Sequence, residues 1–209
     1  MNAETLAASL LTAFDQRQNH ERPFIAVIDG LGGAGKTTVA EALVQQITPV
    51  RPVELIHMDD LIEVRIERYH TGRPEWEEYY FLQWDCDKIA DDLFKPLHAG
   101  CEELVLQFYD KETDDTFEKK VHVKHDSMLL VEGVFLQRPQ WRHYYDYVVF
   151  ADCPLVLRRA RVLERDTYIG SEHAILAKYE TRYWPAEAYY EKTILPKKQA
   201  NAVIKVNSY

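Results

Sequence analysis

The sequence predicts an α/β protein in which helices cover both faces of a mostly parallel sheet. Short apolar runs alternate along the chain with segments of helical periodicity. The runs are apolar throughout, rather than at every second residue, as expected of strands that are buried on both faces. No linker, internal repeat or low-complexity tract divides the chain, so a single domain is expected over residues 1–209.

The first half of the chain contains two predicted strands and three predicted helices. We expect an N-terminal helix within residues 1–20, over 3–17, because Leu6, Leu10 and Phe14 recur at helical spacing. The remaining elements are strands at 23–28 and 53–58 and helices at 39–47 and 85–97.

The second half interrupts this alternation with an inserted β-hairpin, predicted over residues 104–123. Two strand-like runs, 104–109 and 116–123, flank an acidic turn at Asp114 and Asp115. The elements expected after the hairpin are strands at 128–133, 147–151 and 202–206 and helices at 155–166 and 173–191.

The stretch from Gly30 to Thr38 fits the phosphate-binding pattern G-x-x-x-x-G-K-[ST] in full, between a strand and a helix. Without Cβ atoms, its glycines let backbone N–H groups point inward, and the helix adds its positive end. This context argues against an ordinary turn with a chance lysine and predicts the three-layer α/β/α sandwich of the P-loop NTPases. The expected nucleotide-binding residues are Gly30, Gly32, Gly33, Ala34, Gly35, Lys36, Thr37 and Thr38.

Composition limits the classes of partner. The formal net charge is −9 and no basic run offsets it, so neither nucleic acid nor an anionic membrane is expected. The three cysteines match no zinc pattern and indicate a reducing compartment. The N-terminus lacks the basic region of a signal peptide, and no apolar run is long enough to span a membrane. We expect a soluble cytoplasmic protein.

Three acidic residues follow or end predicted strands, where ligands bind in open parallel sheets: Asp59, Asp60 and Glu132. Phosphoryl transfer to a hydroxyl needs a carboxylate that deprotonates the acceptor and oxygen ligands for Mg²⁺. Asp59 suits the first task and Glu132 the second, and Asp59 and Thr37 are further candidates for the metal. Of the two adjacent aspartates, one is expected to cap a helix and the other to act in catalysis, with Asp59 favoured.

A cationic helix face is predicted near residue 160. Arg158, Arg161 and Arg165 share one face of the predicted helix and can close over a triphosphate. The alternative is a solvated surface paired with acids such as Glu164. Together with Gly170 as a hinge, these residues make 158–172 a candidate lid.

Taken together, these residues resemble the uridine kinase family, within the uridine kinase and phosphoribulokinase group of P-loop kinases. The similarity extends from about Phe24 to Val206. It rests on the glycine loop and on the segments 58–60, 84–85, 108–110, 130–133, 161–166 and 178–201.

The resemblance implies a role for each matching residue. Asp59 is similar to the base that activates a nucleoside 5′-hydroxyl, and Glu132 to the acid near Mg²⁺. Tyr109 is similar to the tyrosine beside the substrate base. In addition, Lys36 and Thr37 correspond to phosphate and metal ligands, and Arg161 and Arg165 to lid arginines.

The acceptor pocket departs from the family pattern. Family members that select pyrimidine nucleosides have a histidine five residues after the tyrosine, whereas this chain has Asp114 there, and an ionised carboxylate donates no hydrogen bond. The family acid that holds the ribose hydroxyls precedes a His-Pro pair that is absent here, and Glu77 and Glu78 are the candidates to replace it.

These observations predict ATP- and Mg²⁺-dependent phosphoryl transfer to a small-molecule hydroxyl, with a nucleoside 5′-hydroxyl as the first candidate and Asp59, Tyr109 and Asp114 at the acceptor. Lys36, Asp59, Arg161 and Arg165 are the expected catalytic residues. Two alternatives stay open: a kinase for another small alcohol, such as a ribosylated pyridine or a pantothenate-like molecule, and a nucleotide-dependent switch. A homo-oligomer is also compatible with the sequence.

Overall fold

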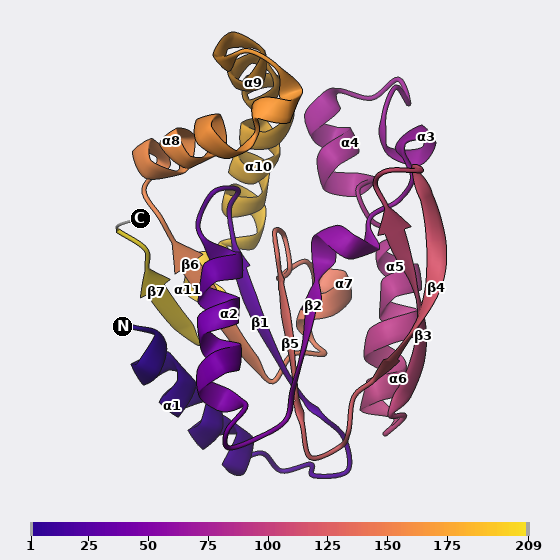
Figure 1. Cartoon of the computed structure of the whole chain (residues 1–209), viewed down its shortest axis with the longest axis vertical. Helices are drawn as coiled ribbons and strands as arrows, with labels where there is room; N and C mark the ends of the chain where they lie inside the picture. Colours follow the sequence, from indigo (N-terminus) through magenta and orange to yellow (C-terminus); the bar gives the residue numbers. More distant parts are fainter. Residues whose placement is uncertain (1, 208–209) are drawn as a thin grey trace.

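A five-stranded sheet forms the centre of the structure, with the strand order β2-β5-β1-β6-β7 (Figure 1). The computed structural model describes residues 2–207. All neighbouring strands of this sheet run parallel. The strands are β1 (Phe24–Gly30), β2 (Val53–His57), β5 (Met128–Gly133), β6 (Tyr147–Asp152) and β7 (Ala202–Lys205).

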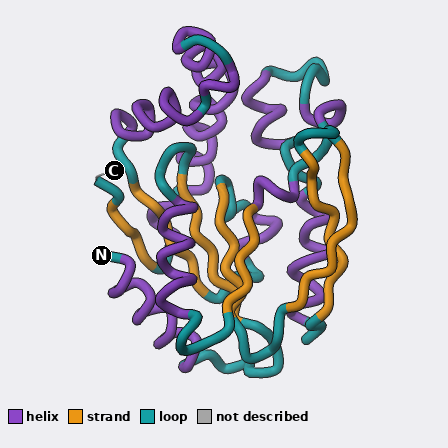
Figure 2. The backbone as a smooth tube through the Cα atoms, in the orientation of Figure 1, coloured by secondary structure: helices purple, strands orange, loops and turns teal. Residues whose placement is uncertain are grey.

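Alternate residues of the central strand β1 belong to two separate cores. Ile25 and Val27 pack into the core on one face of the sheet, whereas Phe24, Ala26 and Ile28 pack into the core on the other. Because successive side chains of a strand point to opposite faces, a wholly apolar strand requires cover on both sides. Figure 2 shows helices on either side of the strands.

One face is covered by α1 (Ala3–Asp15) and α2 (Lys36–Ile47). The side chain of Asn2 caps α1 by accepting a hydrogen bond from the Thr5 amide at 2.9 Å. The helix ends at Asp15, two residues before the predicted end.

The other face is covered by a helical run from 86 to 98, by α7 (Pro139–Arg142) and by α10 (Trp184–Ile194). The run consists of α5 (Cys86–Ile89), the π-helical turn η2 (Ala90–Phe94) and α6 (Lys95–His98), so the helix predicted at 85–97 is present with a widened middle turn. Asp85 caps it by accepting a hydrogen bond from the Lys88 amide at 2.9 Å.

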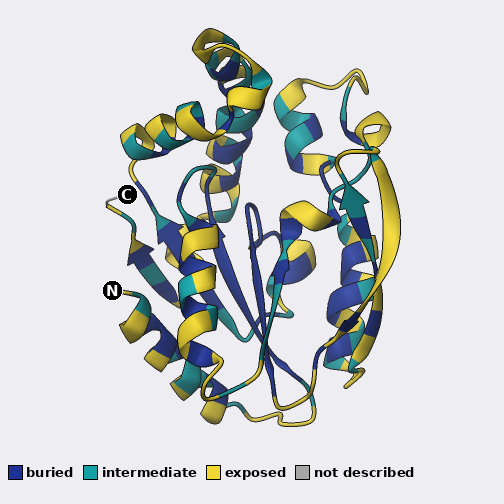
Figure 3. Ribbon diagram, in the orientation of Figure 1, coloured by how far each residue is buried: buried dark blue, intermediate teal, exposed yellow. Residues whose placement is uncertain are grey.

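The inserted hairpin forms a separate antiparallel sheet of β3 (Glu103–Asp110) and β4 (Asp115–His122). Leu104, Leu106 and Phe108 of β3 join the core beneath it, as does Val121 of β4. The rest of β4 is exposed, as Figure 3 shows. The prediction of an α/β fold with a mostly parallel sheet and an inserted hairpin is confirmed.

Short helices gather above the carboxyl ends of the sheet strands (Figure 1). On one side lie the 3-10 turn η1 (Met58–Leu61), α3 (Arg65–Arg68) and α4 (Glu75–Phe81). On the other lie α8 (Leu155–Arg165), η3 (Thr167–Ile169), α9 (Glu172–Lys178) and the π-helical turn η4 (Tyr179–Tyr183), and α11 (Pro196–Gln199) precedes β7. None of the helices in residues 2–207 is long and apolar enough to cross a membrane.

A buried ion pair joins these two groups of helices. Arg182 Nη1 of η4 donates to Glu78 Oε2 of α4 at 3.2 Å. Glu78 Oε1 accepts from the Thr71 amide at 2.7 Å and from the Thr71 hydroxyl at 3.0 Å. Desolvation would raise the pKa of Glu78, but the Thr71 hydrogen bonds and the Arg182 charge outweigh it and hold the pKa below its usual value.

Replacing Glu78 tests this link. We expect Glu78→Gln to lower the free energy of unfolding by about 1.5–3 kcal/mol at neutral pH, the range for hydrogen bonds to charged groups. Since the pKa of Glu78 is lowered by folding, the stabilisation is present above the usual pKa near 4.5 and is lost as the pH falls through the lowered value. Denaturant unfolding across this pH range should show the difference between wild type and variant narrowing in acid. The half-buried neighbour Glu77→Gln is the control, and an equal effect there would contradict the role of the pair.

Candidate active site

The phosphate loop joins β1 to α2 and is shaped by glycines that leave no room for side chains. Gly33 and Gly35 have positive φ angles of 75° and 83°. A β-carbon at Gly30 would lie 2.9 Å from the Ala151 carbonyl oxygen, because β1 and β6 pair at this point. Gly35 is the N-cap residue of α2 and has no side chain to accept from the first-turn amides, which are therefore available to an anion.

Helix α8 packs directly against this loop. A β-carbon at Gly33 would lie 2.9 Å from the Arg158 carbonyl oxygen. Arg158 Nη1 donates to the Gly32 carbonyl oxygen, and Arg161 Nη1 to the Gly33 carbonyl oxygen, each at 3.2 Å. Two of the three arginines predicted to share a face of α8 thus contact the loop backbone.

Glu187 of α10 also contacts the loop, and the sequence did not indicate it. Its Oε1 accepts from the Gly32 amide at 2.7 Å, and its Oε2 accepts from Arg158 Nη1 at 2.7 Å. Burial raises the pKa of Glu187, while the Arg158 charge opposes the rise. A carboxylate from the C-terminal helix therefore links α8, α10 and the glycine loop.

A second acid, Asp29, stabilises the start of the loop from the end of β1, and it is not among the site residues predicted from the sequence. Its carboxylate is fully buried and accepts from the Gly30 amide at 2.9 Å, from Gln137 Nε2 at 2.8 Å and from the Tyr190 hydroxyl at 2.6 Å. Desolvation raises the pKa of Asp29, and the hydrogen bonds from Tyr190 and Gln137 oppose it. One signal was present in the sequence: a charged residue at the end of an otherwise apolar strand.

Lys36 and Thr37 begin α2 beside the loop. Lys36 is buried, and its Nζ donates to the Leu31 carbonyl oxygen at 3.1 Å. Thr37 Oγ1 donates to Glu132 Oε1 at 3.1 Å, so two of the predicted metal ligands are adjacent. A hydroxyl and a carboxylate beside a phosphate loop are oxygen donors of the kind that Mg²⁺ prefers, so these residues fit the ion.

His57 is the third member of this group and was not predicted. Its Nδ1 lies 2.7 Å from the same Oε1 of Glu132. The register between β2 and β5 places the two residues directly opposite each other. Because an ionised carboxylate only accepts, His57 Nδ1 is the donor. Across residues 2–207, no three His, Cys, Asp or Glu side chains are close enough to hold a metal without other ligands.

Asp59 and Asp60 lie in η1, immediately after β2. The N-cap residue of this turn is His57, and neither aspartate makes a side-chain hydrogen bond within the described chain. The prediction that one of them caps a helix is therefore wrong: the chain forms a single 3-10 turn that includes both.

Asp59 is exposed and lines a large cavity. Desolvation near the cavity wall raises the pKa of Asp59; the Lys36 charge opposes the rise, and Glu132 adds to it. A carboxylate whose pKa is raised but which faces open space is suited to accept a proton.

The cavity has a volume of about 980 Å³ and extends from the loop to the hairpin. Gly32, Lys36 and Asp59 line it near the loop. Its other lining residues include Arg68, Tyr69, Tyr79, Tyr109, Arg165, Tyr179 and Tyr183.

Tyr109 and Asp114, predicted beside the acceptor, contact each other at the hairpin end. The Tyr109 hydroxyl donates to Asp114 Oδ1 at 2.9 Å, and the Arg65 amide donates to the same oxygen at 3.0 Å. Tyr109 lines the cavity, whereas Asp114 is not among its lining residues. Glu78, a candidate for the acid that holds ribose hydroxyls, is instead buried against Arg182 and Thr71.

Arg165 lines the cavity with its side chain 62% exposed, and its Nε donates to Asp166 Oδ1 at 2.6 Å. Arg158, Arg161 and Arg165 therefore follow one another along α8 from the glycine loop to the cavity.

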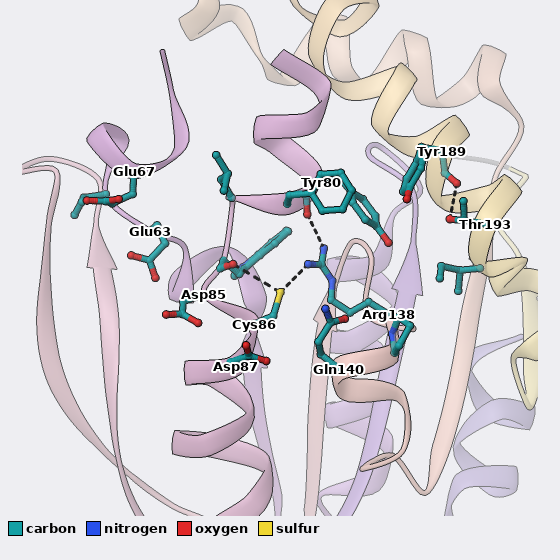
Figure 4. A pocket seen from close by; sticks show the side chains of 16 residues that line it. Glu63, Glu67, Tyr80, Asp85, Cys86, Asp87, Arg138, Gln140, Tyr189 and Thr193 are labelled. Atoms are coloured by element: carbon teal, nitrogen blue, oxygen red, sulfur yellow. Dashed lines mark hydrogen bonds between the residues drawn. The ribbon is translucent and has the colours of Figure 1, made fainter. Parts of the chain in front are cut away.

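A second cavity of about 860 Å³ is lined by Tyr80 and Phe81 of α4 and contains no residue of the phosphate loop (Figure 4). Arg138 projects into it from the segment before α7 and contacts Cys86 and Tyr80. Burial raises the pKa of the Cys86 thiol, with Arg138 opposing the rise, so this thiol stays protonated near neutral pH. Cys86, Cys101 and Cys153 are all free.

Comparison with known proteins identifies relatives that are named as uridine kinases or uridine kinase-like proteins. No protein-family model matches the chain. It is 24% identical over 209 residues to uridine kinase-like protein 3 of Arabidopsis thaliana. That match covers 95% of this chain and 42% of the plant protein. The chain is 26% identical over 148 residues to the uridine kinase of Lactiplantibacillus plantarum, covering 70% of this chain and 69% of that enzyme. The chain thus spans less than half the length of the plant relative.

A solved structure provides a more similar relative. The structure of a possible uridine kinase from Bacillus stearothermophilus is 37% identical and superposes with a TM-score of 0.79. The match covers 97% of this chain and 96% of that one. With this identity over nearly the full length of both chains, and with a complete phosphate loop beside Asp59, the protein belongs to the uridine kinase-like P-loop kinases.

Proposed function

We propose that the protein transfers the γ-phosphoryl group of ATP to a hydroxyl of a small molecule bound beside Asp59. The observation that carries this proposal is that one cavity contains both Lys36 of the phosphate loop and Asp59. A donor phosphate and an acceptor hydroxyl can therefore meet in one cavity, and such positioning supplies much of the catalysis in phosphoryl transfer.

The loop supplies the binding site for the phosphates. The first-turn amides of α2 and the ammonium of Lys36 offer donors and positive charge to the β- and γ-phosphates. Thr37 and Glu132 would hold Mg²⁺, with His57 orienting Glu132. Bound Mg²⁺ neutralises charge on the phosphate oxygens. Asp59, a further candidate ligand, would reach the ion from its place in η1.

Asp59 would orient the acceptor hydroxyl and take its proton. Its raised pKa supports this role, because a carboxylate is a stronger base when its pKa lies nearer to neutral. Arg165 in the cavity and Arg161 against Gly33 would stabilise the charge that develops on the transferred group. Residues 158–172, which include most of α8, would form the lid.

A nucleoside 5′-hydroxyl is the first candidate acceptor, because the relatives are named a uridine kinase, a possible uridine kinase and a uridine kinase-like protein. The aromatic wall of the cavity, with Tyr109, supports a ring-bearing molecule. A different small alcohol is the second candidate, since Asp114 bonds to Tyr109 where pyrimidine-selecting kinases have a histidine. A nucleotide-dependent switch without an acceptor is less well supported, because it gives no role to Asp59.

The free cysteines support a location in the reducing cytoplasm.

Replacing Asp59 tests the proposed base. We expect Asp59→Asn to lower the acceptor-stimulated rate by about 100- to 10,000-fold, the contribution of a positioned general base. ADP release from Mg-ATP would be measured against a panel of nucleosides and related alcohols, with ATP affinity measured separately by calorimetry. ATP affinity should be retained. The neighbouring Asp60→Asn is the comparison variant, and an equal loss in both would contradict the assignment to Asp59.

Replacing His57 tests the metal site. Without the hydrogen bond from Nδ1, Glu132 is less firmly oriented, so His57→Leu should raise the Mg²⁺ concentration for half-maximal turnover by about 10-fold or more. His57→Asn retains a donor near the Nδ1 position and should stay close to wild type. A Mg²⁺ titration of the ADP-release assay distinguishes them. Identical Mg²⁺ dependence in wild type and both variants would show that His57 does not contribute to Mg²⁺ binding.

A further inference from the structure

Four arginines of the described chain are buried, and three of them have partners that account for their burial. Arg158 pairs with Glu187 at 2.7 Å, and Arg182 pairs with Glu78 at 3.2 Å. Arg138 has no carboxylate, but each of its three nitrogens has an acceptor: Phe135 O at 3.1 Å, Cys86 Sγ at 2.8 Å and Tyr80 O at 3.2 Å (Figure 4). These pairings follow the general rule that a buried cation is stable only when its charge or its donors are matched.

Arg68 is the exception. Only 6% of the residue is exposed. Its Nε donates to the Glu63 carbonyl oxygen at 2.6 Å, but its two terminal nitrogens have no hydrogen bond to any residue in the range 2–207. Within the same range, no carboxylate oxygen lies within 4 Å of its guanidinium. These terminal nitrogens are the ends that a bidentate anion would engage.

The surroundings hold Arg68 in a defined place in the wall of the large cavity. Its guanidinium carbon lies 5.1 Å from the centre of the Tyr69 ring and 5.1 Å from that of Tyr109. Arg182 Nη2 donates to the Arg68 carbonyl oxygen at 3.1 Å, so the buried Glu78–Arg182 pair also fixes the Arg68 backbone. Arg68 lines the cavity that contains Asp59 and Lys36.

Within residues 2–207, no neighbouring carboxylate forms an ion pair with Arg68. Asp114 is close enough for Arg68 to help lower its pKa, but the Oδ1 of Asp114 already accepts from Tyr109 and from the Arg65 amide. Arg65 and Lys178 line the same cavity; Arg65 Nε lies 3.9 Å from Asp114 Oδ1, and Lys178 Nζ lies 5.6 Å from the centre of the Tyr69 ring. The carboxylates of Asp110 and Glu112 also line the cavity, but in the described chain neither forms an ion pair with Arg68. Among the residues that the structure describes, the terminal nitrogens of Arg68 therefore remain available to an anion that enters the cavity.

We propose that the phosphoryl acceptor is anionic: besides the hydroxyl presented to Asp59, it carries a carboxylate or phosphate group that Arg68 binds. The inference rests on the proposed function and narrows its substrate class. Arg68 acts as a specificity-determining residue, because an anionic acceptor would pair with terminal nitrogens that have no other partner in residues 2–207.

The test compares acceptors that differ only in charge: orotidine with uridine, pantothenate with panthenol, glycerate with glycerol, and ribose 5-phosphate with ribose. We expect wild type to have a kcat/KM at least about 30-fold higher for the anionic member of a pair that it uses, the lower limit for a buried charge partner. The first three pairs test a carboxylate and the last a phosphate. Arg68→Gln should remove the preference and Arg68→Lys should restore part of it, while the exposed Arg73→Gln should match wild type.

Ligand-induced shifts in unfolding temperature provide a readout that does not depend on turnover. Anionic acceptors should stabilise wild type and not Arg68→Gln. Equal use of neutral and anionic members by wild type would overturn the inference and leave the proposed kinase function intact. Stabilisation by anions that depends on Arg68, without phosphorylation of any acceptor, would uphold the anion site and overturn the proposed function. If the Arg68 variants do not fold, the kcat/KM values of wild type for the neutral and anionic acceptors still test the charge preference.

Discussion

The close approach of three backbones at the glycine loop is the constraint on which the rest of the structure depends. At Gly30 the loop meets β6, and at Gly33 it meets α8, with 2.9 Å between a hypothetical β-carbon and a carbonyl oxygen in each case. Glycine at these positions is what allows the central strand, α8 and the loop to meet. The strand order β5-β1-β6 then brings Glu132 to the same end of the sheet.

Two buried carboxylates stabilise the place where the loop, β1, α8 and α10 meet. Asp29 fixes the start of the loop from within the sheet, and Glu187 ties the Gly32 amide to α10 through Arg158. Each carboxylate is surrounded by donors, which offsets the cost of burying its charge. The same rule makes Arg68 informative, since neither of its terminal nitrogens has a hydrogen-bond partner in residues 2–207, whereas Arg138, Arg158 and Arg182 each have at least one.

The two halves of the proposed site are built differently. The proposed donor half consists of backbone amides and of Lys36 and Thr37, which follow directly from one motif. The proposed acceptor half lies at the part of the cavity formed by η1, α3, the hairpin and η4, which are far apart in the chain. In such an arrangement the phosphate-binding residues can stay the same while cavity residues such as Arg68 and Tyr109 change the acceptor.

The sequence by itself determined the α/β class, the hairpin and the phosphate loop, because periodicity and a contiguous motif are local properties of the chain. It also indicated Asp59 and Glu132, since residues at strand ends converge in any parallel sheet. Only the tertiary structure decided that His57 contacts Glu132, that Glu78 pairs with Arg182, and that Arg68 is buried without a carboxylate. Those facts depend on strand register and on helices that pack across the fold, and a linear pattern does not encode which distant side chains will meet.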